Sequence, residues 1–492
     1  MKYSKKDYIQ LYGELFREVQ QKRVFQDSKT FVDSVPKRNP EQIFQLYSSR
    51  KSELDLKDFV QTHFELPTDN IVNPDLPEQR SMEEHIKLLW NFLKRDNLKP
   101  RKFSSLINLP KPYIIPGGRF REIYYWDSFF TMQGLVISNE IETAENMLDN
   151  FAFLIDEVGH IPNGNRVYYI TRSQPPFFAA MIDLISKYKS KEWQLKYLTQ
   201  LQREYDFWMN DETRLVKINK DEFLNRYYDS DEVPREESYY EDYIEAKNMT
   251  GEKQKQFYRN IRAACESGWD FSSRWFEDES NLSTCATTNI IPVDLNSLLY
   301  FTEKKLAELY LLDGKDELHQ DYVDRSQKRK KLINKYCWKD NFYFDYNFIK
   351  RTNTQTYSLA ACYPLFFEIA SGEQAEKVSQ IIESKFLKDG GLISTLNHTG
   401  QQWDAPNGWP PLQWLVIVGL KNYGFIKLAD EIKNRWLLLN RNVFKRTGKM
   451  FEKYNVEDTT LFAGGGEYDL QDGFGWTNGI ALALANNLDD IN

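Results

Sequence analysis

Apolar residues recur every three or four positions along most of this chain. Ser81 and Glu84 form a capping-box pattern ahead of an apolar run at 86–93. Gly159 stands where a helix C-terminal cap is expected, directly after one such run. That run, which would form one face of a helix, consists of Ala144, Met147, Leu148, Phe151, Leu154, Ile155 and Val158.

The same spacing predicts helices through most of the chain, whereas the alternation typical of strands is scarce. Gly424 separates two helical stretches, so neighbouring helices are expected to pair through short turns. Paired helices form bundles, solenoids or α/α toroids, and the lack of a fixed 34- or 40-residue period argues against TPR and HEAT arrays. The further helical stretches are about 175–188, 192–209, 294–312, 325–338, 373–387, 411–423 and 426–440.

Long segments rich in Gly, Pro, Trp and Asn lie between the predicted helices. Loops of that length are usually functional or disordered, and these are too aromatic to be disordered. They are expected to form the walls of a site at one end of a helical scaffold. Residues 1–100 are more polar and lack such loops, so they are predicted to form a helical extension packed on the main domain, with no chemistry assigned.

The charge balance and hydropathy exclude several classes of protein. The net charge is −8, with 64 Lys and Arg against 72 Asp and Glu, which does not favour nucleic acid as a partner. No apolar run reaches the roughly 18 residues of a membrane span. The N-terminus MKYSKKDYIQLYGELF lacks the apolar core of a signal peptide, which predicts a cytoplasmic protein. We expect a monomer.

Cysteine and histidine are too scattered to indicate a metal site. The five histidines show no HExxH spacing, so neither a metal nor another cofactor is expected. The cysteines form no CxxC pair and are expected to be reduced, mostly buried thiols. They are Cys265, Cys285, Cys337 and Cys362.

The stretch PGGRFREIYYWDSFF at 116–130 clusters polar groups with flat aromatic rings. Gly117 and Gly118 permit a tight turn there. The same residues are equally compatible with a helix start in which Glu122 and Asp127 pair with arginines. The next stretch, HIPNGNRVYYITRSQPPFF at 160–178, offers donors to hydroxyl oxygens, although an Asn-rich turn is more often only a turn. Those donors are Asn163, Asn165, Arg172 and Gln174.

Asp270 lies among aromatic residues in AACESGWDFSSRWF at 263–276. Aromatic surroundings disfavour the charged carboxylate, which raises the pKa and suits a general acid. The alternative is an Asp that caps a helix. Upstream, Arg235 and Glu237 follow a proline in DEVPREESYYEDY, a stretch that would ordinarily form a solvated acidic face.

The C-terminal part carries three more such stretches, which are GQQWDAPNGWPPLQW at 400–414, MFEKYN at 450–455 and AGGGEYDLQDGFGWTNG at 463–479. The first joins aromatic rings to Asp404 and Asn407. Glu452 and Glu467 flank the flexible glycine run at 464–466. That run has no GK[ST] and follows no predicted strand, so nucleotide binding is not indicated.

Together these stretches favour carboxylate chemistry on a neutral polyhydroxylated substrate. Their polar residues are Arg, Asn, Gln, Asp and Glu, interleaved with aromatics that make up 15% of the chain. No GxSxG elbow is present. Glycoside hydrolysis needs two carboxyl groups with different roles, and aromatic faces suit the C–H faces of pyranose rings. The residue types therefore suggest a glycosidase without naming the sugar.

The motifs PGGRFREIYYWDSFF and QQWDAPNGWPP resemble those of the glycoside hydrolase family 37 trehalases, and the resemblance covers about residues 10–485. It implies an all-α fold, an (α/α)6 toroid formed by residues 101–492 with long active-site loops, and no metal. It also implies that α,α-trehalose is hydrolysed with inversion, which releases one α-glucose and one β-glucose.

The resemblance assigns roles by position. Asp270 matches the general acid and Glu452 the general base that activates water. Arg119, Arg172 and Arg235 match three arginines that line the pocket. The remaining positions that match substrate contacts are Phe120, Tyr125, Trp126, Asp127, Asn163, Gln174, Glu237, Gly268, Trp403 and Glu467.

Three alternatives stay open from the residues. The chain could be another toroidal glycosidase that acts on a different disaccharide, such as kojibiose. It could be a non-catalytic sugar-binding protein, although such a protein needs neither Asp270 nor Glu452. A trehalose-phosphate hydrolase would need a basic pocket, for which the arginines are available.

Overall fold

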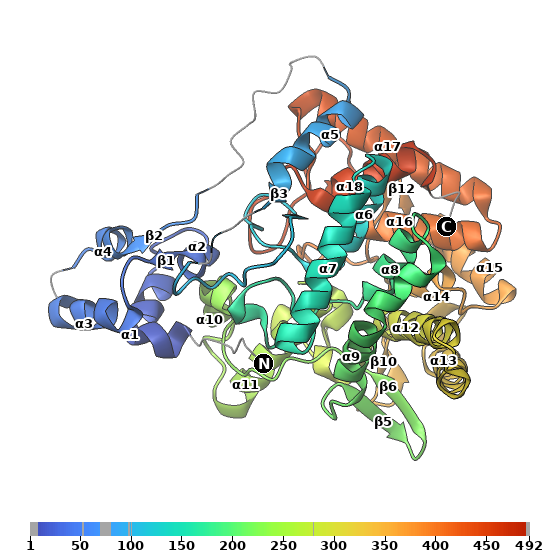
Figure 1. The fold of residues 1–492 in the computed structure, drawn as a ribbon, viewed down its shortest axis with the longest axis horizontal. Coiled ribbons are helices and arrows are strands. Elements are labelled where there is room, and N and C mark those ends of the chain that lie inside the picture. Colours follow the sequence, from blue (N-terminus) through green and yellow to red (C-terminus); the bar gives the residue numbers. More distant parts are fainter. Residues whose placement is uncertain are drawn as a thin grey trace.

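The computed structural model describes residues 8–51, 54–68, 80–96, 99, 101–278 and 280–488. Over these residues the chain is mostly helical, and its short strands form antiparallel pairs and one three-stranded antiparallel sheet in the order β11 (Thr352–Asn353), β10 (Tyr346–Asn347), β7 (Ile290–Ile291) (Figure 1). The prediction of an all-α fold is confirmed.

Six helices form an inner ring. They are rich in apolar and small residues on every side and are buried along most of their length, as expected for helices enclosed by others. Each contacts the next in the ring, and the last packs against the first. The inner helices are α6 (Tyr125–Ile137), α8 (Phe178–Ser186), α12 (Val293–Leu312), α14 (Tyr363–Phe366), α16 (Pro410–Asn422) and α18 (Gly475–Ala485).

A second layer of helices alternates with the inner ones along the chain. These helices are amphipathic, with one apolar face toward the ring and a polar face toward solvent. The alternation gives two concentric layers, the arrangement of an (α/α)6 toroid. The outer helices are α5 (Met82–Leu93), α7 (Ile141–Val158), α9 (Leu198–Met209), α13 (Asp316–Tyr336), α15 (Gly372–Ile381) and α17 (Ile426–Thr447).

Two glycines allow the ring to close. A Cβ atom on Gly479 of α18 would lie 2.1 Å from the carbonyl oxygen of Phe130 in α6. A Cβ atom on Gly134 of α6 would lie 2.5 Å from the Cα atom of Gly479. Because neither residue has a side chain, the backbones of the first and last inner helices come into direct contact.

The predicted helix ends agree with the structure where a cap is present. Ser81 and Glu84 form the expected capping box at the start of α5, and Gly159 ends α7 with φ of 100°. Helix α13 begins at Asp316, well before the predicted 325, because its first turns are mostly polar and show little apolar periodicity. Helix α17 continues past the predicted 440 to a cap at Gly448.

The strands are short and join loops rather than build a layer. The pair β14–β15 matters for the site, because it ties the loop before α16 to the residues that follow Glu452. The strands are β1 (Val35–Pro36), β2 (Phe64–Glu65), β3 (Lys94–Arg95), β4 (Tyr113–Ile114), β5 (Leu215–Asn219), β6 (Glu222–Asn225), β7 (Ile290–Ile291), β8 (Trp338–Lys339), β9 (Phe342–Tyr343), β10 (Tyr346–Asn347), β11 (Thr352–Asn353), β12 (Leu387–Lys388), β13 (Gly391–Leu392), β14 (Asn407–Gly408) and β15 (Tyr454–Asn455).

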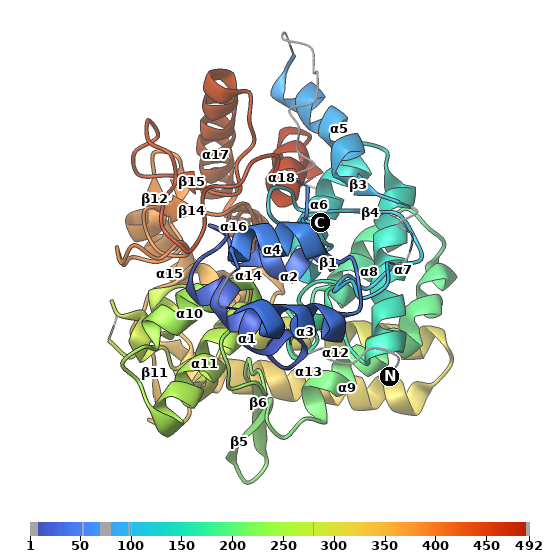
Figure 2. The same cartoon turned by 90° about the vertical axis from the view of Figure 1, so that its left-hand side faces the viewer.

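The N-terminal helices lie in front of one end of the ring (Figure 2). They pack on the loop region that contains α10 (Tyr239–Glu245) and α11 (Gly251–Glu266), and the side chain of Gln20 donates to the carbonyl oxygen of Glu236 at 3.1 Å. A domain boundary at residue 100 stays a prediction. These helices are α1 (Tyr8–Gln21), α2 (Lys29–Asp33), α3 (Pro40–Arg50) and α4 (Leu56–His63).

Candidate active site

The stretches that carry polar and aromatic residues end where inner helices begin. Residues 116–124 precede α6, 160–177 precede α8, 267–292 precede α12, 400–409 precede α16 and 450–474 precede α18. An outer helix returns the chain between successive inner helices, so the inner helices all start at the same end of the ring. Segments far apart in the sequence therefore meet at that end.

A cavity lies where these loops meet, and it brings together every predicted site residue except Tyr125. Eight further residues line it that were not among the predicted site residues. Most are aromatic, and the others are a serine and a cysteine. They are Tyr124, Tyr169, Ser238, Cys265, Trp409, Tyr468, Phe474 and Trp476.

Tyr125 is fully buried outside the cavity, and its neighbour Tyr124 lines the cavity instead. The Tyr125 hydroxyl donates to Glu204 Oε1 in α9 at 2.8 Å and accepts from the backbone N–H of Phe178 at 2.9 Å. Tyr125 is the first residue of α6, and successive residues of a helix point about 100° apart. The position of Tyr125 in the motif does not show which of the two tyrosines points inward.

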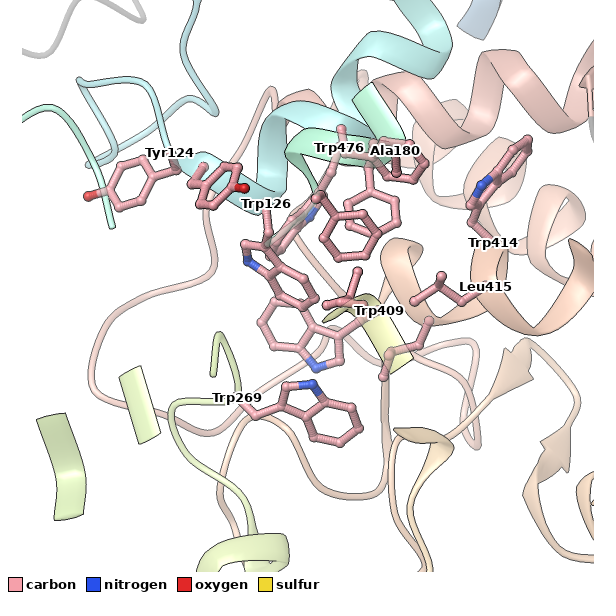
Figure 3. Close-up of a cluster of buried hydrophobic side chains, with 14 of the residues drawn as sticks. Tyr124, Trp126, Ala180, Trp269, Trp409, Trp414, Leu415 and Trp476 are labelled. Atoms are coloured by element: carbon pink, nitrogen blue, oxygen red, sulfur yellow. The ribbon is translucent and has the colours of Figure 1, made fainter. Parts of the chain in front are cut away.

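Indole rings line part of the cavity, and Figure 3 shows Trp126, Trp409 and Trp476 within a cluster of buried hydrophobic side chains. Trp403 and Trp409 stack with ring centroids 3.8 Å apart and an angle of 2° between planes. The ring centroid of Trp126 lies 5.7 Å from that of Trp403, and the ring of Trp476 contacts both stacked rings edge-on. Such flat apolar surfaces suit the C–H faces of a pyranose ring.

Gly268 lets the chain pass close to these rings. Its φ is +76°, and a Cβ atom there would lie 2.7 Å from the indole of Trp126. A side chain at this position would push into the ring that faces the cavity, so the backbone of residue 268 itself forms part of the lining.

Two of the three arginines are held by buried carboxylates. Arg172 donates to Glu237 Oε1 at 2.6 Å and to Asn163 Oδ1 at 3.1 Å, and its Nη1 lies 3.8 Å from Asp229 Oδ2. Arg235 binds Asp242 and donates to Glu467 Oε1 at 2.7 Å. Both guanidinium groups are therefore fixed in orientation before any ligand binds.

The third arginine is held by the N-terminal region. Arg119 donates to both carboxylate oxygens of Asp27, at 3.0 and 2.7 Å, and stands over the ring of Tyr468. No chemistry was assigned to residues 1–100 from the sequence, and no local pattern around Asp27 indicates this contact.

The pKa of Asp270 is raised to about 7. Burial is the largest cause, and the carboxylate of Glu467 adds to it, whereas the guanidinium of Arg235 acts in the opposite direction. A carboxyl group with this pKa carries its proton over much of the neutral range, as a general acid must.

Glu452 has different surroundings. It is 1% exposed, accepts from the Tyr468 hydroxyl at 2.8 Å, and accepts from Lys453 Nζ at 3.0 Å. Its backbone carbonyl accepts from the Trp476 indole at 2.9 Å. A phenol and an ammonium group are donors that stabilise an ionised carboxylate.

A third carboxyl group, Asp127, lies in the same cavity. Its pKa is raised well above the usual value, first by burial and then by the charges of Glu452 and Asp270. A neutral carboxyl group at this position is able to donate a hydrogen bond to a hydroxyl oxygen.

Several polar residues of the motifs support the loops instead of lining the cavity. Asp404 accepts from Ser272 Oγ and from the backbone N–H of Ser273, both at 2.8 Å, which joins two site loops. Asn165 accepts from the backbone N–H of Ile123 at 2.9 Å. Glu122 pairs with two buried cations, Arg166 and Lys29. The alternative interpretation of this stretch, in which Glu122 pairs with arginines at a helix start, therefore describes Glu122 in part.

Comparison with solved structures places the fold among glycoside hydrolases. Neutral trehalase Nth1 from Saccharomyces cerevisiae superimposes with a TM-score of 0.67 at 25% identity, covering 96% of this chain and 94% of that one. A GH63 mannosylglycerate hydrolase from Thermus thermophilus gives a TM-score of 0.55 at 16% identity, covering 76% and 95%. The second likeness concerns the fold alone.

Curated relatives correct the expected location. A periplasmic trehalase of Escherichia coli O1:K1 is 43% identical over 487 residues, covering 96% of this chain and 86% of the relative. A periplasmic trehalase of Pseudomonas aeruginosa is 44% identical over 486 residues, covering 96% and 89%. The predicted cytoplasmic location is therefore wrong. The prediction rested on the character of the first residues, which is weaker evidence of location than relatives that match most of the chain.

Two further findings concern membrane-spanning helices and the family of the chain. Among the described residues, no helix is long and apolar enough to cross a membrane. The family model for trehalase matches residues 23–489, which takes in all the stretches that meet at the cavity. By this match and by its relatives, the chain belongs to the trehalase family.

Proposed function

We propose that this chain hydrolyses α,α-trehalose with inversion of configuration, with Asp270 as the general acid and Glu452 as the general base. Membership of the trehalase family supports an α,α-trehalase that splits trehalose into glucose. The observation that carries the assignment of roles is the contrast between the two carboxyl groups. Asp270 has a pKa raised to about 7, whereas Glu452 accepts from an ammonium group and a phenol.

The reaction requires one proton to be given and one to be taken. Protonated Asp270 donates to the bridging oxygen as the bond to one anomeric carbon breaks. Ionised Glu452 removes a proton from a water molecule, whose oxygen attacks that carbon from the opposite face. An inverting pair needs a separation of roughly 6.5–9.5 Å to hold this water. One glucose leaves in the α form, and the attacked glucose becomes β.

The remaining groups of the cavity suit hydroxyl recognition. The guanidinium groups of Arg172 and Arg235 are held in place by carboxylates and present fixed donors. Asp127, whose pKa is raised, adds a neutral donor. The indole rings of Trp126, Trp403, Trp409 and Trp476 add apolar surface to the lining.

A second cavity adjoins the first and supports a substrate of two rings. It has a volume of about 540 Å³ and shares Arg119, Ser238, Glu467 and Tyr468 with the inner cavity. We assign one glucose ring to each cavity, with the glycosidic bond between them.

The outer cavity also favours a neutral disaccharide over a phosphorylated one. Arg119 is already paired with Asp27, and Arg23 lies 3.9 Å from Glu241. The carboxylates of the lining therefore offset its cations, which leaves little positive charge for a phosphate.

The oligomeric state is also part of the proposal, and we expect a monomer. Size-exclusion chromatography with light scattering tests that point. The names of the periplasmic relatives support a periplasmic location for this chain.

The proposed function is tested by proton NMR of the purified protein mixed with trehalose, with the anomeric signals followed during the first minutes. Equal early amounts of α- and β-glucose are expected. Early α-glucose alone would indicate retention and contradict the roles given to Asp270 and Glu452. No glucose from a folded protein would direct the search to another disaccharide, such as kojibiose, or to a sugar-binding protein.

A further inference from the structure

A lysine is buried beside Glu452, one of the two carboxyl groups that carry the proposed reaction. Lys453 is 1% exposed, and its Nζ donates to Glu452 Oε2 at 3.0 Å and to Gln402 Oε1 at 2.9 Å. The same Nζ stands 4.9 Å from the ring centroid of Trp409. Burying an ammonium group is costly unless it is paired and hydrogen-bonded, so these contacts account for its position.

The second partner of this lysine reaches the other carboxyl residue. Gln402 Nε2 donates to the backbone carbonyl oxygen of Asp270. The backbone carbonyl of Gln402 accepts from the Trp409 indole at 2.9 Å and from Asn407 Nδ2 at 3.1 Å. The NH2 group of the Gln402 side chain can only donate, and its partner is the carbonyl oxygen of Asp270. Its amide oxygen can only accept, and its partner is the ammonium group of Lys453. The orientation of the side-chain amide is therefore determined.

We propose that Lys453 and Gln402 form a positioning bridge that links Glu452 to Asp270. Lys453 orients the Glu452 carboxylate, and Gln402 holds the backbone of Asp270 at a set place relative to it. This inference rests on the proposed function, because it assumes that these two carboxyl groups are the base and the acid. Neither bridge residue was singled out from the sequence, and both act through their neighbours.

Several charged and titratable groups surround Glu452. Asp127 from α6 and Asp270 from the loop before α12 bring two more carboxyl groups to the same cavity, and the charge of Glu452 contributes to the raised pKa of Asp127. The Tyr468 hydroxyl donates from the loop before α18. Lys453 is the cation that contacts the Glu452 carboxylate directly among the described residues.

The test measures kcat and KM against pH for Lys453→Met. Loss of the ammonium group removes the hydrogen bond and ion pair that hold the Glu452 carboxylate, so the acidic limb of kcat/KM is expected to differ from that of the wild type. We expect kcat at the optimum to fall on the order of 100-fold, as for a displaced catalytic group, with KM changed less than kcat.

A second variant separates the two halves of the bridge. Gln402→Met removes the link to Asp270 but leaves Lys453 in contact with Glu452. We therefore expect kcat to fall while the acidic limb stays at the wild-type pH. An acidic limb that moved equally in both variants would contradict the separate roles.

The matched control is Lys433→Met. Lys433 is also buried, at 8% exposed, but lies on α17 and donates to Asn487 Oδ1 at 2.7 Å. Its replacement is expected to leave kcat and the pH profile unchanged. Circular dichroism checks the folding of each variant, and Lys453→Gln serves for the same comparison if Lys453→Met does not fold.

The outcomes distinguish the bridge from the function on which it rests. A folded Lys453→Met with the wild-type acidic limb and kcat overturns the bridge, provided that Glu452→Gln is inactive. A Glu452→Gln variant with near-normal turnover overturns the proposed function itself. A shifted limb together with an inactive Glu452→Gln supports both.

Discussion

Asp27 and Arg119 form a two-point ion pair, with N···O distances of 3.0 and 2.7 Å. The pair joins the N-terminal region, just before α2, to the loop before α6, and both residues line the outer cavity. The N-terminal region therefore does more than cover the outside of the ring. It determines where the guanidinium of Arg119 lies.

Replacing Asp27 by Asn should weaken substrate binding more than stability. The pair is partly exposed, so its loss should cost less than about 1 kcal/mol of folding free energy. A free Arg119 loses its fixed orientation, which should raise KM for trehalose about 10-fold through a lost charge-assisted contact. Steady-state kinetics and thermal unfolding measure the two effects.

Glu65→Gln is the control for that prediction. Glu65 pairs with Arg101 in the same N-terminal region, and both side chains are exposed. Its replacement should leave KM unchanged. An unchanged KM in Asp27→Asn as well would mean that Arg119 is held by its other contacts.

The two carboxyl groups proposed as acid and base should be individually indispensable. Asp270→Asn cannot donate the proton, and Glu452→Gln cannot accept one. Each variant should lose about 10²–10⁴-fold in kcat/KM while it remains folded. Glucose release from trehalose measures the loss, and near-normal turnover in either variant would contradict the assignment.

Activity should decline as the pH rises through the pKa of Asp270, about 7. The general acid must carry its proton, so kcat/KM falls on the basic side of that value. Glu467 raises the pKa of Asp270 and also pairs with Arg235, which lowers it. Glu467→Gln removes the negative charge that raises the pKa of Asp270 and leaves Arg235 without its ion pair to Glu467. Both changes lower the pKa of Asp270, so the basic limb of kcat/KM should move to lower pH.

A suitable control for the pH prediction is Glu457→Gln, which removes a carboxylate that pairs with His398 away from the cavity. Its basic limb should match the wild type. A limb that moves to higher pH in Glu467→Gln would show that Glu467 does not act on Asp270 through charge.

Gly479→Ala should destabilise the fold. The new Cβ would lie 2.1 Å from the Phe130 carbonyl oxygen, and backbone atoms cannot move aside as a flexible side chain does. The first and last inner helices would have to separate, at a cost of about 1–3 kcal/mol or more. Urea unfolding followed by circular dichroism measures the change.

Gly372→Ala provides the comparison. A Cβ atom there meets nothing within 4 Å, and the residue begins α15. This substitution should be neutral or slightly stabilising, because alanine favours a helix more than glycine does. Equal stability of the two variants would contradict the role of Gly479 in closing the ring.

The sequence was sufficient for the helices and for the stretches that form the site. Apolar spacing is a local property, so it revealed α7, α16 and α17, and the caps at Ser81 and Gly159 followed from residue type. The motifs placed the carboxyl and guanidinium groups on loops between helices, and those loops do meet at one cavity.

The tertiary structure alone decided which side chains meet. Asp27 and Arg119 are 92 positions apart, and Gln402 and Asp270 are 132 apart, so no local pattern relates them. The inward position of Tyr124 in place of Tyr125 depends on where α6 begins in three dimensions. Each of these contacts depends on how the ring closes, because closure determines which loops lie side by side and which direction each side chain takes.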